Sequence, residues 1–284
     1  MHDNRGRRMM DPRLQIRVQR YGWDAAASHY HAGWQEQLKS AHDTLLEMAQ
    51  IQPGDRVIET ACGSGMVTTR LAKIVGQDGH VIATDLSQGM IDDLKRRMTE
   101  AGIGNVEACR MPAEKLDHPD DTFDAAICAL GLMYMPDPEK AVEEMTRLVA
   151  PGSTVSATVW GERRNCGWAD VFPIVDARVA SEVCPMFFGT GAPNALVTLF
   201  EKAGLTDVTE HRQSDLLSFT DEKAMLDAVL MGGPVALAVK RFDNATLSEV
   251  CHDFLNSVAA FRAPDGRYHI PGEFVSVSAR VPGA

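Results

Sequence analysis

The sequence lacks several features that would point to other classes of protein. Its six cysteines include no C-x-x-C pair, so a structural zinc site has no support and no metal is expected. No apolar stretch approaches the roughly 18 residues that a membrane-spanning helix needs. No apolar segment follows the N-terminal charges, as it would in a signal peptide. These absences predict a cytoplasmic protein with reduced thiols and no membrane partner.

Excess positive charge is also missing. The chain has 28 Lys and Arg against 39 Asp and Glu, which gives a formal net charge of -11. An acidic protein repels phosphate backbones, so nucleic acid is not expected as a partner. The 284 residues are 45% hydrophobic, which suffices for one large domain. A homodimer is kept as an alternative to a monomer.

After Pro53, short apolar runs alternate with amphipathic segments. Such alternation favours an α/β fold, in which helices cover both faces of a parallel sheet. We expect strands at residues 56–60, 80–84, 106–109, 123–129, 154–160, 207–213 and 273–280, and helices at 66–75, 88–101, 138–149 and 194–203.

A glycine turn follows the first expected strand. Gly63 and Gly65 permit a sharp turn and a close approach to a ligand, and Asp85 ends the second strand 20 residues after Gly65. An acid there can accept hydrogen bonds from both hydroxyls of a ribose. Dinucleotide-binding proteins share this spacing, so it does not by itself distinguish NAD from S-adenosylmethionine. Two residues favour S-adenosylmethionine over NAD. Thr68 stands where a third glycine would be, and Glu59 would repel a pyrophosphate but favour an ammonium group.

These residues resemble the first motif and the ribose-binding acid of class I S-adenosylmethionine-dependent methyltransferases, of the broad group that resembles ubiquinone/menaquinone-biosynthesis methyltransferases. The segments at 123–127, 132–138 and 149–153 also resemble that family. The resemblance implies a Rossmann-like sheet with an antiparallel last strand, and S-adenosylmethionine as cofactor with S-adenosylhomocysteine as product. The cofactor-binding residues implied are Glu59, Ala61, Cys62, Gly63, Gly65, Asp85, Leu86, Met90, Met111, Ala113, Ala129 and Tyr30.

The chain departs from the family after the third strand. Many relatives have an Asp there that binds the adenine amino group, but this sequence has Pro112. Adenine recognition would then rest on the Ala113 backbone and on packing by Leu86 and Met111.

The family chemistry is an in-line displacement, for which the protein mainly supplies positioning and a dry site. The candidate catalytic residues near the methyl group are His29, His31 and Tyr134. For the two histidines, an exposed or structural role is the alternative.

We expect a single domain over residues 1–284, with an N-terminal helical cap at 1–50. Within that cap, residues 18–50 read as one helix. Helical insertions at 161–193 and 215–263 are expected over the acceptor site. Aromatic residues and a methionine in and before the first insertion suggest an apolar cover and therefore a small, partly apolar acceptor. They are Trp160, Trp168, Phe172, Met186, Phe187 and Phe188. An NAD-linked oxidoreductase and a catalytically silent, cofactor-binding regulatory protein of the same fold are the alternatives.

Overall fold

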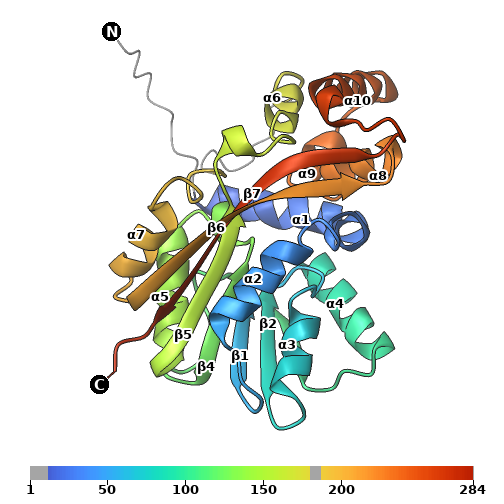
Figure 1. The fold of residues 1–284 in the computed structure, drawn as a ribbon. Helices are drawn as coiled ribbons and strands as arrows, with labels where there is room; N and C mark the ends of the chain where they lie inside the picture. Colours follow the sequence, from blue (N-terminus) through green and yellow to red (C-terminus); the bar gives the residue numbers. More distant parts are fainter. Residues whose placement is uncertain (1–11, 180–186, 284) are drawn as a thin grey trace.

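The computed structural model describes residues 12–179 and 187–283, and its centre is a seven-stranded sheet in the order β3-β2-β1-β4-β5-β7-β6 (Figure 1). Strands β1 to β5 pair in parallel, whereas β7 is antiparallel to both β5 and β6. The predicted α/β fold with its antiparallel last strand is confirmed. The strands are β1 (Arg56–Thr60), β2 (His80–Asp85), β3 (Val106–Arg110), β4 (Phe123–Ala129), β5 (Val149–Trp160), β6 (Thr206–Phe219) and β7 (Tyr268–Arg280).

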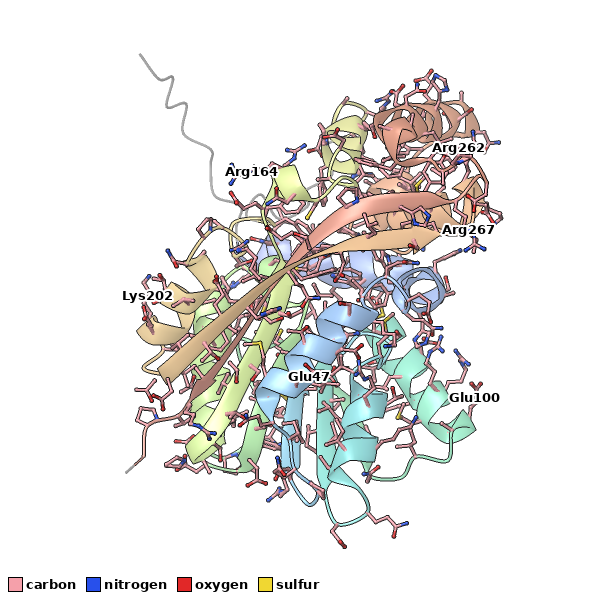
Figure 2. All side chains as sticks on the ribbon, in the orientation of Figure 1. Glu47, Glu100, Arg164, Lys202, Arg262 and Arg267 are labelled. Atoms are coloured by element: carbon pink, nitrogen blue, oxygen red, sulfur yellow. The ribbon has the colours of Figure 1, made fainter. Side chains whose placement is uncertain are left out.

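Apolar runs form the central strands because helices bury both of their faces. On one face, Val57 and Val81 pack with helices α2 (Lys39–Ala49) and α3 (Thr68–Val75), and α4 (Gln88–Glu100) continues this layer. On the other face, Ile58 packs with α5 (Pro138–Leu148) and α7 (Ala195–Lys202). Charged side chains such as Glu47, Glu100 and Lys202 are exposed on the outer surfaces of these helices (Figure 2).

The helix expected at residues 18–50 is two helices, α1 (Pro12–Trp34) and α2. Residues 35–38 between the two helices contain no proline or glycine, although Gly33 lies next to the end of α1. Instead, Trp34 is buried and its indole N–H donates to the carbonyl oxygens of Ala228 and Gly232 at 3.0 and 3.1 Å. Helix α1 thus lies across the end of the sheet while α2 packs against its face, a tertiary effect that local sequence does not encode.

The antiparallel pair of strands β6 and β7 is longer than the sequence predicts. Residues 215–219, expected in a helical insertion, belong to β6, and β7 begins at Tyr268, which pairs with Phe219. The two strands pair their backbone N–H and C=O groups with each other well beyond the core sheet. The polar residues of this part of β6 show no clear alternation with apolar ones, so the sequence shows no strand signal there.

A second group of helices surrounds the far end of the β6–β7 pair, close to α1 (Figure 1). It contains α6 (Val171–Asp176), α8 (Glu222–Leu226), the π-helical turn Asp227–Met231, α9 (Ala236–Val239) and α10 (Asn244–Ser257). Met186 of the expected apolar cover lies outside the described residues. None of the helices described is long and apolar enough to cross a membrane.

Helix α1 and the π-helical turn approach each other at Gly33. A Cβ at this position would lie 2.8 Å from the Cα of Ala228. We expect Gly33→Ala to push the two elements apart and to destabilise the protein by about 1–3 kcal/mol, measured by thermal or urea unfolding. Gly104→Ala is the control, because a Cβ there meets nothing within 4 Å. Equal stability of the two variants would contradict this packing.

Candidate functional site

A cavity opens at the carboxyl ends of β1 to β4, the edge where ligands bind in open α/β sheets. Helix α1 forms its opposite wall through Ile16, Gln19, Trp23 and Tyr30. The remaining lining residues follow the strands: Ala61 and Gly63 after β1, Asp85, Leu86 and Met90 after β2, Met111, Pro112, Ala113 and Glu114 after β3, and Ala129, Leu130, Gly131, Tyr134, Met135 and Pro136 after β4.

The Asp85 carboxylate joins two segments of this site. The backbone N–H of Gly63 donates to its Oδ2 and that of Ser87 to its Oδ1, both at 2.8 Å. Burial raises the pKa of Asp85 to about 6, while the hydrogen bonds from Ser87 and Gly63 lower it. Each oxygen keeps a further lone pair, so the carboxylate can still accept a hydrogen bond from a ligand in the cavity.

The loop after β1 is held in shape by Gly65. Its φ is +86°, and a Cβ there would lie 2.2 Å from Cδ1 of Leu94, a core residue of α4. Only glycine therefore lets this loop rest on α4. Cys62 is buried in the same loop and ties it to β2 through a hydrogen bond from its N–H to the Thr84 carbonyl. Neither Gly65 nor Cys62 lines the cavity.

Glu59 lies beneath the loop and outside the cavity lining. It is 1% exposed, and the Thr68 hydroxyl donates to its Oε2 at 2.6 Å. Burial raises the Glu59 pKa to about 8, with the Thr68 hydrogen bond opposing and the Asp85 charge adding to the rise. A group with this pKa is largely protonated at pH 7 and would ionise in response to a nearby cation.

Helix α1 is fastened over the cavity by Asp24. Its Oδ1 accepts hydrogen bonds from the Ser87 hydroxyl at 2.6 Å and the Gly89 N–H at 3.0 Å, at the start of α4. Six residues further along α1, Tyr30 reaches the glycine loop, since a Cβ on Gly63 would lie 3.3 Å from its ring. The aromatic and polar residues of α1 therefore close the site from above.

A second, smaller hollow continues from the cavity toward the end of β5. We call it the aromatic chamber, because six of the side chains that line it are aromatic. It shares Trp23, Tyr30, Leu130 and Tyr134 with the cavity, so the two are adjacent. The other lining residues are Trp34, Leu38, Trp160, Trp168, Gly232, Gly233 and Pro234. The indole N–H of Trp168 is buried without a hydrogen-bond partner.

Most residues predicted from the sequence line the cavity: Tyr30, Ala61, Gly63, Asp85, Leu86, Met90, Met111, Ala113, Ala129 and Tyr134.

The two candidate histidines do not line the cavity or the chamber. His29 borders a separate surface groove with Ser28 and Glu36. The Nδ1 of His31 lies 3.0 Å from the Ser64 hydroxyl, and burial together with the charge of Arg97 lowers the pKa of His31. Successive helical residues point in different directions, so Tyr30 faces the site while its two neighbours face away.

Sequence reasoning missed Glu114 and Gln19 as lining residues, and it missed the neighbours of Tyr134: Leu130, Gly131, Met135 and Pro136. Glu114 stands two residues after Pro112 and could have been found as the next acid in the segment. Gln19 had no comparable signal, because its role depends on how α1 lies over the sheet. In the described part of the chain, no three His, Cys, Asp or Glu residues are grouped to hold a metal ion.

Comparison with known proteins agrees with this geometry. Residues 57–152, from β1 into β5, match the family model of a methyltransferase domain. Residues 57–152 therefore resemble a methyltransferase domain. The matched segment contains the glycine loop, Asp85 and the residues after β3, whereas Trp160, Trp168 and the residues at 232–234 lie outside it.

The relatives of this methyltransferase domain include two quinone-pathway proteins. The ubiquinone/menaquinone biosynthesis C-methyltransferase of Teredinibacter turnerae is 31% identical over 121 residues, which are 42% of this chain and 49% of that protein. The demethylmenaquinone methyltransferase of Listeria monocytogenes is 28% identical over 142 residues, which are 50% of this chain and 57% of that protein. The chain spans about half the length of these curated relatives.

Solved structures share the methyltransferase fold at low identity. Phosphoethanolamine N-methyltransferase 2 of Haemonchus contortus, solved with S-adenosylhomocysteine, has a TM-score of 0.61 at 14% identity and covers 96% of this chain and 60% of that one. The [4+2]-cyclase SpnF has a TM-score of 0.58 at 19% identity and covers 88% and 83%. Proteins with different named activities thus share this fold, and the activity must be argued from the site.

The raised pKa of Glu59 predicts a pH-dependent cost to stability in the absence of ligand. The folded protein keeps a proton on Glu59 up to about pH 8, whereas the unfolded chain loses it above the ordinary glutamate pKa of 4.5. This contribution to stability is complete below about pH 4.5 and is lost as the pH rises through about 8.

Glutamine stays neutral and can still accept from Thr68, so it should avoid this cost. We expect Glu59→Gln to melt with the wild type near pH 5 and about 2–6 °C above it at pH 8 to 9 in calorimetry. Glu107→Gln, at an exposed position on β3, is the control and should show no pH-dependent gain. A constant difference between Glu59→Gln and the wild type at all pH values would contradict the assignment.

Proposed function

We propose that the chain transfers the methyl group of S-adenosylmethionine to a small, partly apolar molecule by in-line displacement and releases S-adenosylhomocysteine. The observation that carries this proposal is the order of the groups along one sheet edge. The residues after β3, Asp85 after β2, the glycine loop after β1 and the aromatic chamber near β4 and β5 follow one another in space. This order suits a base, a ribose, a methionine moiety and a methyl acceptor in turn.

The cavity residues fit this cofactor. Asp85 can accept hydrogen bonds from the ribose hydroxyls while it holds Gly63 and Ser87. Met90 and Met111 line the same cavity and offer polarisable apolar surface to a purine. Glu59 lies under the loop and would carry a negative charge when an ammonium group approaches, directly or through water.

When bound, the sulfonium supplies an already activated methyl group. The chain then has to orient the acceptor and exclude water. The chamber suits this task, because its described lining is aromatic and aliphatic apart from two tyrosine hydroxyls and the indole N–H groups. It suits a small acceptor with an apolar body.

No described residue in the chamber is an ordinary general base. Tyr30 and Tyr134 are the titratable residues in its described lining, and burial with the charges of Asp85 and Glu59 raises the pKa of Tyr30 well above its usual range. Tyr30 therefore stays protonated and can donate a hydrogen bond. We infer that the acceptor atom is nucleophilic near neutral pH without help from a strong base.

The names of the quinone-pathway relatives do not fix the acceptor of this chain. The family model ends at residue 152, and Trp160, Trp168 and residues 232–234 of the chamber come after it. Residues that contact the acceptor are therefore free to differ from those relatives, so the proposal keeps to a class of acceptor.

Calorimetric titration with S-adenosylhomocysteine tests the cofactor site. We expect the wild type to bind it and Asp85→Asn to bind about a hundredfold more weakly, because charge-assisted hydrogen bonds contribute about 1.5–3 kcal/mol each. Asp92→Asn, exposed on α4, is the control and should bind as the wild type does. Methyl transfer from labelled S-adenosylmethionine to a panel of small apolar acceptors completes the test. A wild type that binds no S-adenosylhomocysteine would refute the proposal.

Cofactor affinity should rise with pH. The carboxyls of Asp85 and Glu59, with pKa values of about 6 and 8, must lose protons to meet hydroxyl donors and an ammonium group. Binding therefore releases protons, and the dissociation constant should fall between about pH 5.5 and 8 by up to tenfold per pH unit for each group. Calorimetry in buffers of different ionisation enthalpy measures the protons released. Glu59→Gln should flatten the profile above pH 7, and a profile that is flat in the wild type would contradict this coupling.

A further inference from the structure

The segment after β3 lacks the acid that the family resemblance leads one to expect. Pro112 occupies that position and lines the cavity, but it has neither a side-chain acceptor nor a backbone N–H. Its neighbours Met111 and Ala113 add only apolar side chains to the lining. An amino group on a base in this part of the cavity would therefore lack a side-chain acceptor from these three positions.

Glu114 lines the same cavity and carries an unsatisfied acceptor. Its Oε1 is buried and has no hydrogen-bond partner. Buried polar atoms are rarely left unpaired in folded proteins, because such an atom loses its hydrogen bonds to water without gaining others. Burial is the largest cause of a raised pKa at Glu114, and backbone N–H groups of Glu114 and Asp137 oppose it. A donor from a ligand would both satisfy Oε1 and favour the ionised carboxylate.

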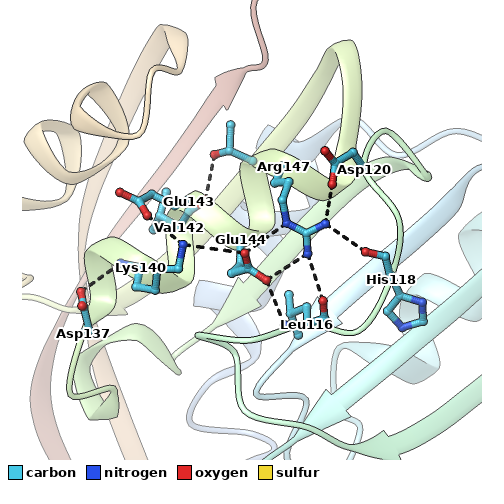
Figure 3. Close-up of polar contacts among 10 residues, drawn as sticks. Leu116, His118, Asp120, Asp137, Lys140, Val142, Glu143, Glu144 and Arg147 are labelled. Atoms are coloured by element: carbon cyan, nitrogen blue, oxygen red, sulfur yellow. Dashed lines mark hydrogen bonds and ion pairs between the residues drawn. The ribbon is translucent and has the colours of Figure 1, made fainter.

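The backbone on both sides of Glu114 is fixed. Before it, the Met111 N–H donates to the carbonyl oxygen of Asp85 at 2.9 Å. After it, the Leu116 N–H donates to Glu144 and the Leu116 carbonyl accepts from Arg147, both at 3.0 Å. Figure 3 shows how Arg147 and Glu144 of α5 hold this segment. The position of the Glu114 backbone is thus set by the fold, before any ligand binds.

The strand order places Glu114 on the base side of the site. Asp85 ends β2, the glycine loop lies one strand away after β1, and Glu114 follows β3 on the opposite side. A nucleoside with its ribose on Asp85 and its chain over the glycine loop directs its base toward β3. Among the cavity-lining residues that follow β3, Glu114 has the one polar side chain.

We infer that the Glu114 carboxylate accepts a hydrogen bond from the exocyclic 6-amino group of the cofactor's adenine, in place of the acid that Pro112 has removed. This inference rests on the proposed cofactor. It makes Glu114 a specificity-determining residue, because a 6-oxo purine would bring an oxygen against the carboxylate and leave both acceptors unpaired.

Three ligands test the inference by calorimetry: S-adenosylhomocysteine, its analogue with hydrogen at position 6, and its 6-oxo (inosine) analogue. The wild type should bind S-adenosylhomocysteine at least about tenfold more tightly than either analogue, since a hydrogen bond to a charged group contributes about 1.5–3 kcal/mol. Glu114→Gln should reduce this preference without removing it, because its amide oxygen can still accept a hydrogen bond but carries no charge. Its affinity for the 6-hydrogen analogue should match that of the wild type, and it should tolerate the 6-oxo analogue better because an amide can turn its N–H toward an oxygen.

Glu107→Gln on the exposed side of β3 is the matched control and should keep the wild-type preference. Wild-type protein that binds S-adenosylhomocysteine and the 6-hydrogen analogue equally would overturn the role of Glu114 and leave the proposed function standing. A Glu114→Gln variant that binds S-adenosylhomocysteine and the 6-hydrogen analogue more weakly by the same factor would also overturn that role. That result would show that Glu114 only supports the loop after β3. Failure of the wild type to bind S-adenosylhomocysteine would instead refute the proposed function. The wild-type preference needs no variant, so the test survives a Glu114→Gln protein that does not fold.

Discussion

The site depends on one buried carboxylate. Asp85 joins the glycine loop after β1 to the start of α4 by accepting hydrogen bonds from Gly63 and Ser87. Ser87 in turn holds Asp24 of α1, so the same chain of contacts closes the roof over the cavity. These bonds lower the Asp85 pKa against the effect of burial. The group that is proposed to hold the ribose is thus also the group that shapes the loop, and its loss would affect both.

The sequence was informative where local pattern and structure agree. Apolar runs, the glycine turn and Asp85 lie in a βαβ unit whose geometry depends on few residues, so the sheet and most cavity residues could be predicted. The division of the N-terminal helix at Trp34 could not, because it depends on carbonyl oxygens about 200 residues away in the sequence. His29 and His31 were chosen for their chemistry, but helical geometry points them away from the cavity. Glu114 is the next acid after Pro112, but its buried, unpaired Oε1 is a property of the fold that the local sequence does not encode.

The cavity and the aromatic chamber differ in how much of their lining lies in the segment that matches the methyltransferase family model. The glycine loop, Asp85 and the segment after β3 fall within the matched methyltransferase domain. The aromatic chamber draws on α1, on Trp160 and Trp168, and on the turn at residues 232–234, outside that segment. The indole rings of Trp34, Trp160 and Trp168 meet edge to face, with centroid distances of 4.9 to 6.0 Å, and so pack against one another in its wall. The matched segment thus contains the proposed donor site, while the proposed acceptor side is shaped largely by residues outside it.

The most direct test is a crystal structure of the complex with S-adenosylhomocysteine. The account predicts ribose hydroxyls on Asp85, the adenine amino group within hydrogen-bond distance of Glu114, and the sulfur facing the aromatic chamber between Tyr30 and Tyr134. A ligand bound in the reverse direction, with its base in the chamber, would contradict the account. So would a sulfur that faces away from the chamber, because no methyl acceptor could then be reached from it.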